Sequence, residues 1–205
     1  MGTVTSLEMY RLQRRGRGAG ARQALPRTTL YFDLASPYTY LAAERAERLF
    51  AGLEWRPACV EVLQCPEFGP DGMAAVAERA ARLSLPLVWP DGYPYRVRGA
   101  MRVASLAADR GCGAPFVLAA SRLAFCGGFD IDDPEILAEA AAAAGIGLAE
   151  TLQAAGDVGR DGPMEDIGRL LLVGGVQQLP VLRVGRLLFC GEDRLLEAAA
   201  ARAAV

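Results

Sequence analysis

A strand-forming run that ends in a serine–proline pair constrains the fold of this chain more than any other feature. Residues 28–34 are rich in β-branched and aromatic residues, and Ser36-Pro37 follows almost at once. From residue 37 to 50 the apolar residues recur at spacings of three and four, which predicts a helix with one buried stripe. A second apolar run covers residues 53–60. The pattern predicts a strand–helix–strand unit, and therefore an α/β fold.

Ser36 is the main candidate for a functional residue. A serine at the N-cap, with Pro37 in the first helical position, leaves the N–H groups of the first turn facing outward. A bound anion or thiolate would be stabilised there. Ser-Pro also begins many helices that bind nothing, so the local pattern by itself favours simple capping.

The composition excludes several kinds of chemistry. The 205 residues include no histidine, so Ser-His-Asp and Cys-His catalysis are excluded. The net charge of -2 argues against a nucleic-acid partner. No apolar run approaches the roughly 18 residues that cross a bilayer, so we expect no membrane association. The cysteines form neither a Cys-x-x-Cys pair nor a zinc-site spacing, so we expect no metal and a cytoplasmic protein with reduced thiols: Cys59, Cys65, Cys112, Cys126 and Cys190.

The two flanks of this unit have different compositions. Residues 1–27 carry six arginines and one glutamate without the apolar segment of a secretory signal, so we expect a disordered or poorly ordered tail. Residues 65–174 have helical periodicity, with Asp133 as an N-cap and Gly145 as a helix stop. Residues 85–95 are rich in proline and aromatic residues, which predicts a rigid loop acting as a packed connector. The predicted helices cover residues 72–83, 99–109, 115–126, 134–144, 148–155 and 163–173.

The C-terminal segment returns to strand patterns. Residues 181–184 and 187–190 read as a hairpin around Gly185-Arg186, and a last helix begins near Glu192. The complete order is strand–helix–strand, several helices, then strand–strand–helix. This order predicts a thioredoxin-like domain, formed by residues 28–64 and 175–205, with an inserted all-helical domain at residues 65–174.

Four ordered motifs point to one family. The first is Phe32-Asp33-Leu34-Ala35-Ser36-Pro37-Tyr38, and the others lie at residues 125–145, 175–180 and 189–195. From about Leu30 to its C-terminus the chain resembles the 2-hydroxychromene-2-carboxylate isomerases and kappa-class glutathione transferases, in the DsbA-like branch of the thioredoxin superfamily. In that family the serine takes the place of the first redox cysteine.

The resemblance implies a thiol cofactor: glutathione or another low-molecular-weight thiol. It implies that Pro180 is cis and lies beside Ser36, and that the backbone of the thiol pairs with Leu179. The γ-glutamyl end would lie near Glu192 and Asp193. Ser36 would meet the sulfur, with Pro37 beside it. A homodimer is also expected from the family.

The implied reaction is isomerisation of a small aromatic or unsaturated carboxylate through addition and loss of the thiolate. A helix terminus stabilises a nearby anion by about 0.3–2 kcal/mol and a hydrogen bond to a charged acceptor by about 1.5–3 kcal/mol. Together they would lower the pKa of the thiol by roughly 1.5–3 units. Arg96, Arg98 and Arg102 are candidate partners for the carboxylate, although solvated helix charges are the favoured interpretation.

Three alternatives stay open: a DsbA-like oxidoreductase family member without Cys-x-x-Cys, a glutathione transferase, and a non-catalytic thiol-binding protein. Gln178 stands where the family has glycine, and Val181 where threonine is usual. The asparagine and lysine that hold the glycyl end of glutathione are absent between residues 60 and 99, so a different low-molecular-weight thiol is kept as an alternative to glutathione. Cys126 and Cys190 replace aromatic residues of the family pattern, and we expect them to be small apolar fillers.

Overall fold

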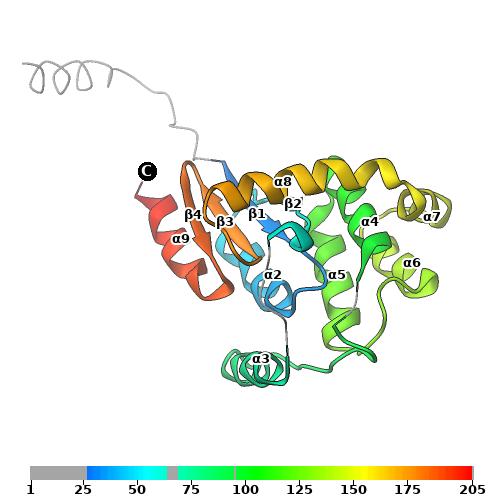
Figure 1. The fold of residues 1–205 in the computed structure, drawn as a ribbon, viewed down its shortest axis with the longest axis horizontal. Helices are drawn as coiled ribbons and strands as arrows, with labels where there is room; N and C mark the ends of the chain where they lie inside the picture. Colours follow the sequence, from blue (N-terminus) through cyan, green and yellow to red (C-terminus); the bar gives the residue numbers. More distant parts are fainter. Residues whose placement is uncertain (1–26, 64–68, 95, 205) are drawn as a thin grey trace, which may run out of the picture.

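The computed structural model describes residues 27–63, 69–94 and 96–204. A four-stranded mixed sheet lies among helices, with α8 running along it (Figure 1). The order of the elements is the predicted one, and the α/β prediction is confirmed. The predicted tail falls almost wholly outside the described residues, as does Cys65.

The strand order of the sheet is β2-β1-β3-β4. β1 (Thr28–Phe32) is parallel to β2 (Glu54–Pro57), so the carboxyl ends of these two strands meet at one edge. β3 (Val181–Val184) is antiparallel to β1 and to β4 (Leu187–Cys190). This pairing brings the C-terminal hairpin against the strand that leads to Ser36.

Side-chain alternation divides the core into two layers. Leu30 and Phe32 are fully buried among the residues of α2 (Pro37–Leu49) and α9 (Leu195–Ala203). Tyr31, which lies between them, packs instead with Leu171 of α8 (Asp161–Val173). Because successive strand residues point to opposite faces, both faces of the sheet are covered.

Helices fill the connection between β2 and β3. A 3₁₀ turn, η1 (Val60–Leu63), follows β2, and another, η2 (Val158–Arg160), precedes α8. Trp55 of β2 packs so closely on α5 that a Cβ atom at Gly113 would lie 2.9 Å from that of Trp55. The helices are α3 (Pro70–Arg82), α4 (Arg98–Asp109), α5 (Gly113–Phe125), α6 (Pro134–Ala143) and α7 (Leu148–Gly156).

The sequence patterns predicted some helix and strand boundaries accurately and others less accurately. Asp133 caps α6 through its side chain, as predicted, and Gly145 has the positive φ of +74° typical of a glycine helix stop. Both predicted strands were too long, because β1 ends at Phe32 and β2 at Pro57. The last α-helix begins after a 3₁₀ turn, η3 (Glu192–Arg194), and not at Glu192. The division of the chain into two domains stays a prediction.

No helix among the described segments combines the length and the apolar character that a membrane crossing requires.

Candidate functional site

Ser36 and Leu179 meet where β1 leads into α2. Ser36 is the N-cap residue of α2 by position, but its side chain makes no capping hydrogen bond, so the prediction of simple side-chain capping was wrong. Its hydroxyl donates instead to the carbonyl oxygen of Leu179, at 3.2 Å. Ser36 is partly exposed, whereas Leu179 and Pro37 are buried.

The Leu179–Pro180 peptide bond is cis, as the resemblance implied. The N–H of Gly191 donates to the carbonyl oxygen of Pro180, at 2.9 Å, and thereby ties the end of β4 to this bend. A Cβ atom at Gly191, where φ is +98°, would lie 2.6 Å from a carboxylate oxygen of Asp193 and 3.7 Å from Nε2 of Gln178. The serine, the cis-proline bend and the acidic turn therefore lie next to one another.

Asp33 organises the loop before Ser36, a role that was not predicted from the sequence. It is 5% exposed, and its carboxylate accepts the N–H of Ala35 at 2.8 Å. Its carbonyl oxygen accepts the N–H of Ser36 at 3.1 Å. The aspartate three residues before Ser36 was the available signal, since Asp side chains commonly bind backbone N–H groups two residues ahead.

The aromatic loop reaches the same place. The hydroxyl of Tyr93 donates to the carbonyl oxygen of Ala35, at 3.0 Å. The ring of Tyr93 lies 4.9 Å from that of Trp89, and both rings contact Phe125. Residues 85–94 thus pack as the predicted connector, and the hydroxyl of Tyr93 contacts the residue directly before Ser36. The Tyr93–Pro94 bond is cis as well, which the sequence analysis did not predict.

Glu192 differs from its neighbour Asp193 in exposure. Glu192 is 3% exposed, and its carboxylate binds the guanidinium groups of Arg45 of α2 and Arg79 of α3. Asp193 is exposed. Glu192 therefore joins three elements, and the role of either residue in binding a thiol stays a prediction.

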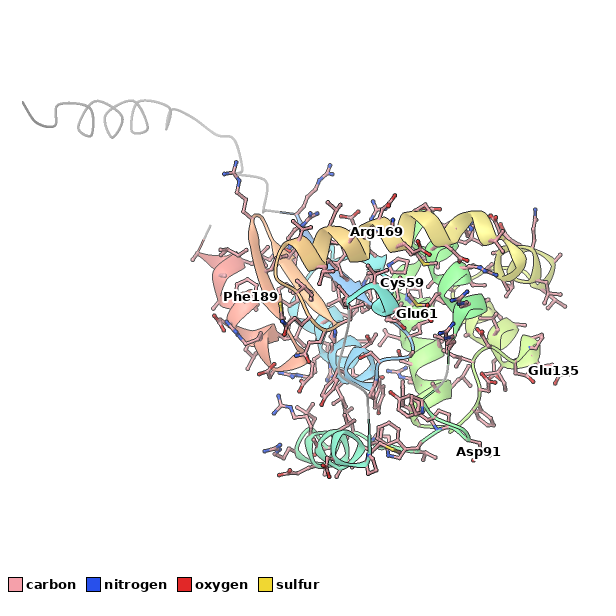
Figure 2. The ribbon with its side chains drawn as sticks, in the orientation of Figure 1. Cys59, Glu61, Asp91, Glu135, Arg169 and Phe189 are labelled. Carbon is pink, nitrogen blue, oxygen red and sulfur yellow. The ribbon has the colours of Figure 1, made fainter. Side chains whose placement is uncertain are left out.

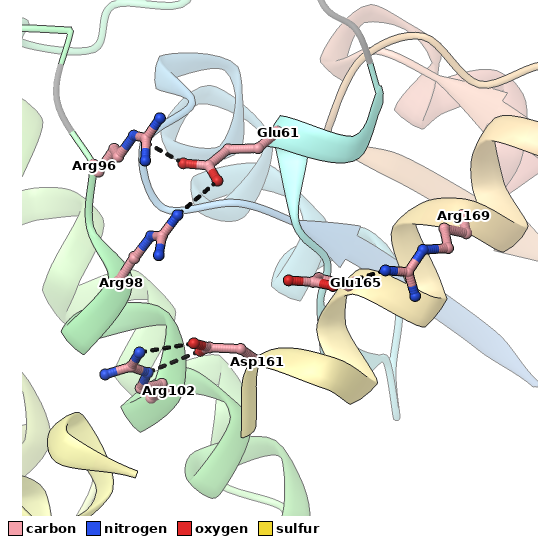
Figure 3. Close-up of polar contacts among 7 residues, drawn as sticks. All are labelled: Glu61, Arg96, Arg98, Arg102, Asp161, Glu165 and Arg169. Atoms are coloured by element: carbon pink, nitrogen blue, oxygen red, sulfur yellow. Dashed lines mark hydrogen bonds and ion pairs between the residues drawn. The ribbon is translucent and has the colours of Figure 1, made fainter. Parts of the chain in front are cut away.

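The three candidate arginines fall into two groups. Arg102 forms a bidentate pair with Asp161, at 2.8 and 2.7 Å, and donates to the carbonyl oxygen of Ala155. The hydrogen bonds from Arg102 hold the pKa of Asp161 below its usual value. Arg96 and Arg98 both contact Glu61 (Figure 3). Arg102 therefore joins α4 to α8, whereas the side chains of Arg96 and Arg98 are exposed.

The described cysteines lack a disulfide partner among residues 27–63, 69–94 and 96–204. Cys59 lies beside Glu61 on the segment after β2 (Figure 2). Burial raises the pKa of the thiols of Cys59 and Cys190. Cys126 donates to the hydroxyl of Tyr40, at 3.2 Å, and that hydroxyl donates to the carbonyl oxygen of Pro86. Within the same described ranges, no group of three or more acidic or cysteine side chains could hold a metal ion.

The structure is similar to several solved protein structures. It matches a 2-hydroxychromene-2-carboxylate isomerase with a TM-score of 0.70 at 19% identity, over 86% of this chain and 95% of the isomerase. It matches a protein described as a DsbA oxidoreductase from Streptomyces coelicolor with a TM-score of 0.66, also at 19% identity, over 87% and 89% of the two chains. The thiol-disulfide exchange protein alpha-DsbA2 from Wolbachia pipientis gives 0.53 at 17% identity, over 97% of this chain and 92% of its own.

The chain has a DsbA-like thioredoxin fold. No family model and no curated protein matches the sequence. Sequence identities below a fifth establish the fold alone.

Proposed function

We propose that this protein is a thiol-dependent isomerase of the 2-hydroxychromene-2-carboxylate isomerase type, with Ser36 as the residue that stabilises the cofactor thiolate. Glutathione is the first candidate for the thiol. The observation that carries the proposal is the hydrogen bond between the Ser36 hydroxyl and the Leu179 carbonyl oxygen.

That hydrogen bond defines what a ligand must offer. A ligand that separates the two groups leaves one hydroxyl donor and one carbonyl acceptor, and both need new partners because unpaired polar groups are costly. A cysteinyl peptide meets both needs, since its amide N–H pairs with Leu179 while its sulfur accepts from Ser36. A thiolate accepts this bond better than a thiol, so the exchange favours ionisation.

The N-terminus of α2 adds to this effect. The first-turn N–H groups of α2 are not capped by the Ser36 side chain, and the positive end of the helix dipole stabilises a nearby anion. Since Pro37 occupies the first helical position, it removes one donor without disturbing the others.

The thiolate would act as a reversible nucleophile. Its sulfur forms a bond to the unsaturated carbon of a conjugated keto-acid, and the electron pair of the double bond moves to the carbonyl oxygen. The former double bond then rotates, the electron pair returns, and the carbon–sulfur bond breaks to release the thiolate. The neighbouring rings of Trp89 and Tyr93, which the Tyr93 hydroxyl ties to Ala35, would hold the substrate ring.

Disulfide exchange is the main alternative, because two of the similar structures are named for it. Ser36-Pro37-Tyr38-Thr39 offers no thiol at the position of a redox pair. The raised pKa values of Cys59 and Cys190 also disfavour the thiolate that exchange requires.

The test is to follow the isomerisation of 2-hydroxychromene-2-carboxylate by ultraviolet absorbance, with glutathione, with cysteine and without thiol. We expect thiol-dependent turnover that Ser36→Ala reduces. Insulin reduction is measured in parallel. Insulin reduction unaffected by Ser36→Ala, with no isomerisation, would support the oxidoreductase instead.

A further inference from the structure

Two arginines share one carboxylate beside the candidate site. Arg96 Nε lies 3.1 Å from one carboxylate oxygen of Glu61, and an Nη atom of Arg98 lies 3.1 Å from the other (Figure 3). The side chains of Arg96, Arg98 and Glu61 are 72%, 55% and 39% exposed. This cluster, the arginine pair with Glu61, therefore faces solvent with an excess of positive charge.

The cluster lies at the same edge of the sheet as Ser36. Glu61 follows the last residue of β2 by four positions, just as Ser36 follows the last residue of β1. The two strands are parallel, so both segments leave the sheet at one edge. The N–H of Ala58 donates to the carbonyl oxygen of Phe32, at 2.9 Å, which continues this pairing toward the site.

Residues on either side of the arginine pair contact the loop that leads to Ser36. Before the pair, Tyr93 donates to the carbonyl oxygen of Ala35. After the pair, in the first turn of α4, Met101 Sδ accepts the N–H of Leu34 at 3.3 Å. The arginine pair therefore lies, along the chain, between two contacts with the loop that leads to Ser36.

The ion pairs of Arg96 and Arg98 with Glu61 are of a kind that a ligand can replace. Arg102 shows the contrast, because it is 13% exposed and binds both oxygens of Asp161. Arg96 and Arg98 instead reach one exposed carboxylate through one nitrogen each. Exposed ion pairs are weak, so an incoming acid can replace Glu61 at little cost.

We propose that Arg96 and Arg98 anchor the carboxylate of the substrate and that Glu61 competes with the substrate for them. The group that the pair holds in the structure is itself a carboxylate, so a carboxylic acid is the class of ligand that can take its place. The proposal depends on the proposed function only in equating that acid with the substrate. Because an acid must displace Glu61, the acids that bind best are those that also make a second contact. An aromatic ring that packs against Tyr93 would provide one.

The test uses salicylate, an aromatic carboxylate, and its neutral amide, titrated into the full chain by calorimetry. Glu61→Gln keeps the side-chain shape and weakens the competitor, so salicylate affinity should rise about two- to fivefold. Arg96→Gln with Arg98→Gln should lower it about tenfold. Salicylamide should bind with the same affinity to all variants.

Arg169→Gln is the matched control, because Arg169 is 57% exposed and also pairs with carboxylates, those of Glu165 and Asp166. It should leave salicylate binding unchanged. The proposal is overturned if Glu61→Gln leaves salicylate affinity unchanged or lowers it, or if the double arginine variant binds salicylate normally. Thiol binding is titrated separately with glutathione, so failure of the thiol site is distinguishable from failure of the anchor.

Discussion

The hydroxyl of Ser36 donates to the carbonyl oxygen of Leu179 across 143 positions of sequence. This contact joins the start of α2 to the residue before a cis-proline, and it places one donor and one acceptor side by side. Whatever binds here must replace that hydrogen bond with two others. A thiol next to an amide does so, and an isolated thiol does not.

A thiol with an amide and a thiol without one test whether a ligand must replace both the Ser36 hydroxyl and the Leu179 carbonyl as hydrogen-bond partners. We expect γ-glutamylcysteine to bind more tightly than mercaptoethanol, because only the former supplies an amide N–H for Leu179. One hydrogen bond is worth about 0.5–1.5 kcal/mol, so the difference from this contact should be about two- to tenfold in Kd. Competition titration against glutathione measures it. Equal affinities would remove Leu179 from the binding site.

Tyr93 should act through both its hydroxyl and its ring. Tyr93→Phe removes the hydrogen bond to Ala35 and should lower the free energy of unfolding by about 1 kcal/mol. Because the ring remains, we expect KM for the aromatic acid to change little in Tyr93→Phe and to rise in Tyr93→Ala. Steady-state kinetics and thermal unfolding of the two variants separate these roles. An identical KM in both would show that the ring does not contact the substrate.

Glu192 should matter for stability more than any surface acid. Removing its carboxylate leaves Arg45 and Arg79 without their shared partner in a largely buried setting. Breaking such a contact costs about 3–5 kcal/mol when fully buried, and the partial exposure of both arginines reduces our expectation for Glu192→Ala to about 2–3 kcal/mol. Urea unfolding measures this loss.

Glu165→Gln is the control for Glu192→Ala, since Glu165 is 42% exposed in its pair with Arg169. An exposed pair contributes about 0–1 kcal/mol. Equal losses in the two variants would contradict the anchoring role of Glu192.

Gly168 lets α8 approach the segment after β2. A Cβ atom there would lie 2.8 Å from the carbonyl oxygen of Cys59, which is backbone and cannot rotate away. We expect Gly168→Ala to destabilise the protein by about 1–3 kcal/mol. Gly162→Ala in the same helix meets nothing within 4 Å and should be neutral or slightly stabilising. Thermal unfolding compares them, and similar Tm values would contradict the close approach.

The bond between Arg102 and Asp161 should make stability depend on acid pH. Arg102 holds the pKa of Asp161 below its ordinary value of 3.8, so the folded state binds this proton less readily than the unfolded state. The pair's contribution is present above pH 3.8 and is lost as the pH falls through the lower folded-state pKa. Wild type should therefore exceed Asp161→Asn in unfolding free energy at neutral pH, and the gap should close in acid. A gap independent of pH would contradict this assignment.

The sequence predicted features that depend on neighbouring residues. The cap at Asp133, the stop at Gly145 and the hairpin at residues 181–190 rest on local chemistry, and they are present. Strand ends were less accurate because pairing across the sheet, rather than apolar composition, decides where β1 and β2 stop.

The site was only partly predictable from sequence. The pattern at Ser36 indicated a cap, and only the resemblance placed that residue beside Leu179 and a cis Pro180. The contact of Tyr93 with Ala35 spans 58 positions, and a tertiary contact of this kind leaves no periodic signal. The contacts of Arg96 and Arg98 with Glu61 were not predicted for the same reason.

Calorimetric titration of glutathione into wild type and Ser36→Ala, with the ultraviolet thiolate absorbance recorded on the same samples, decides whether Ser36 stabilises a bound thiolate. We expect thiolate near neutral pH in the wild-type complex, and in Ser36→Ala a pKa of the bound thiol that is about one to two pH units higher. Glutathione that binds both proteins equally and stays a thiol in both would contradict it.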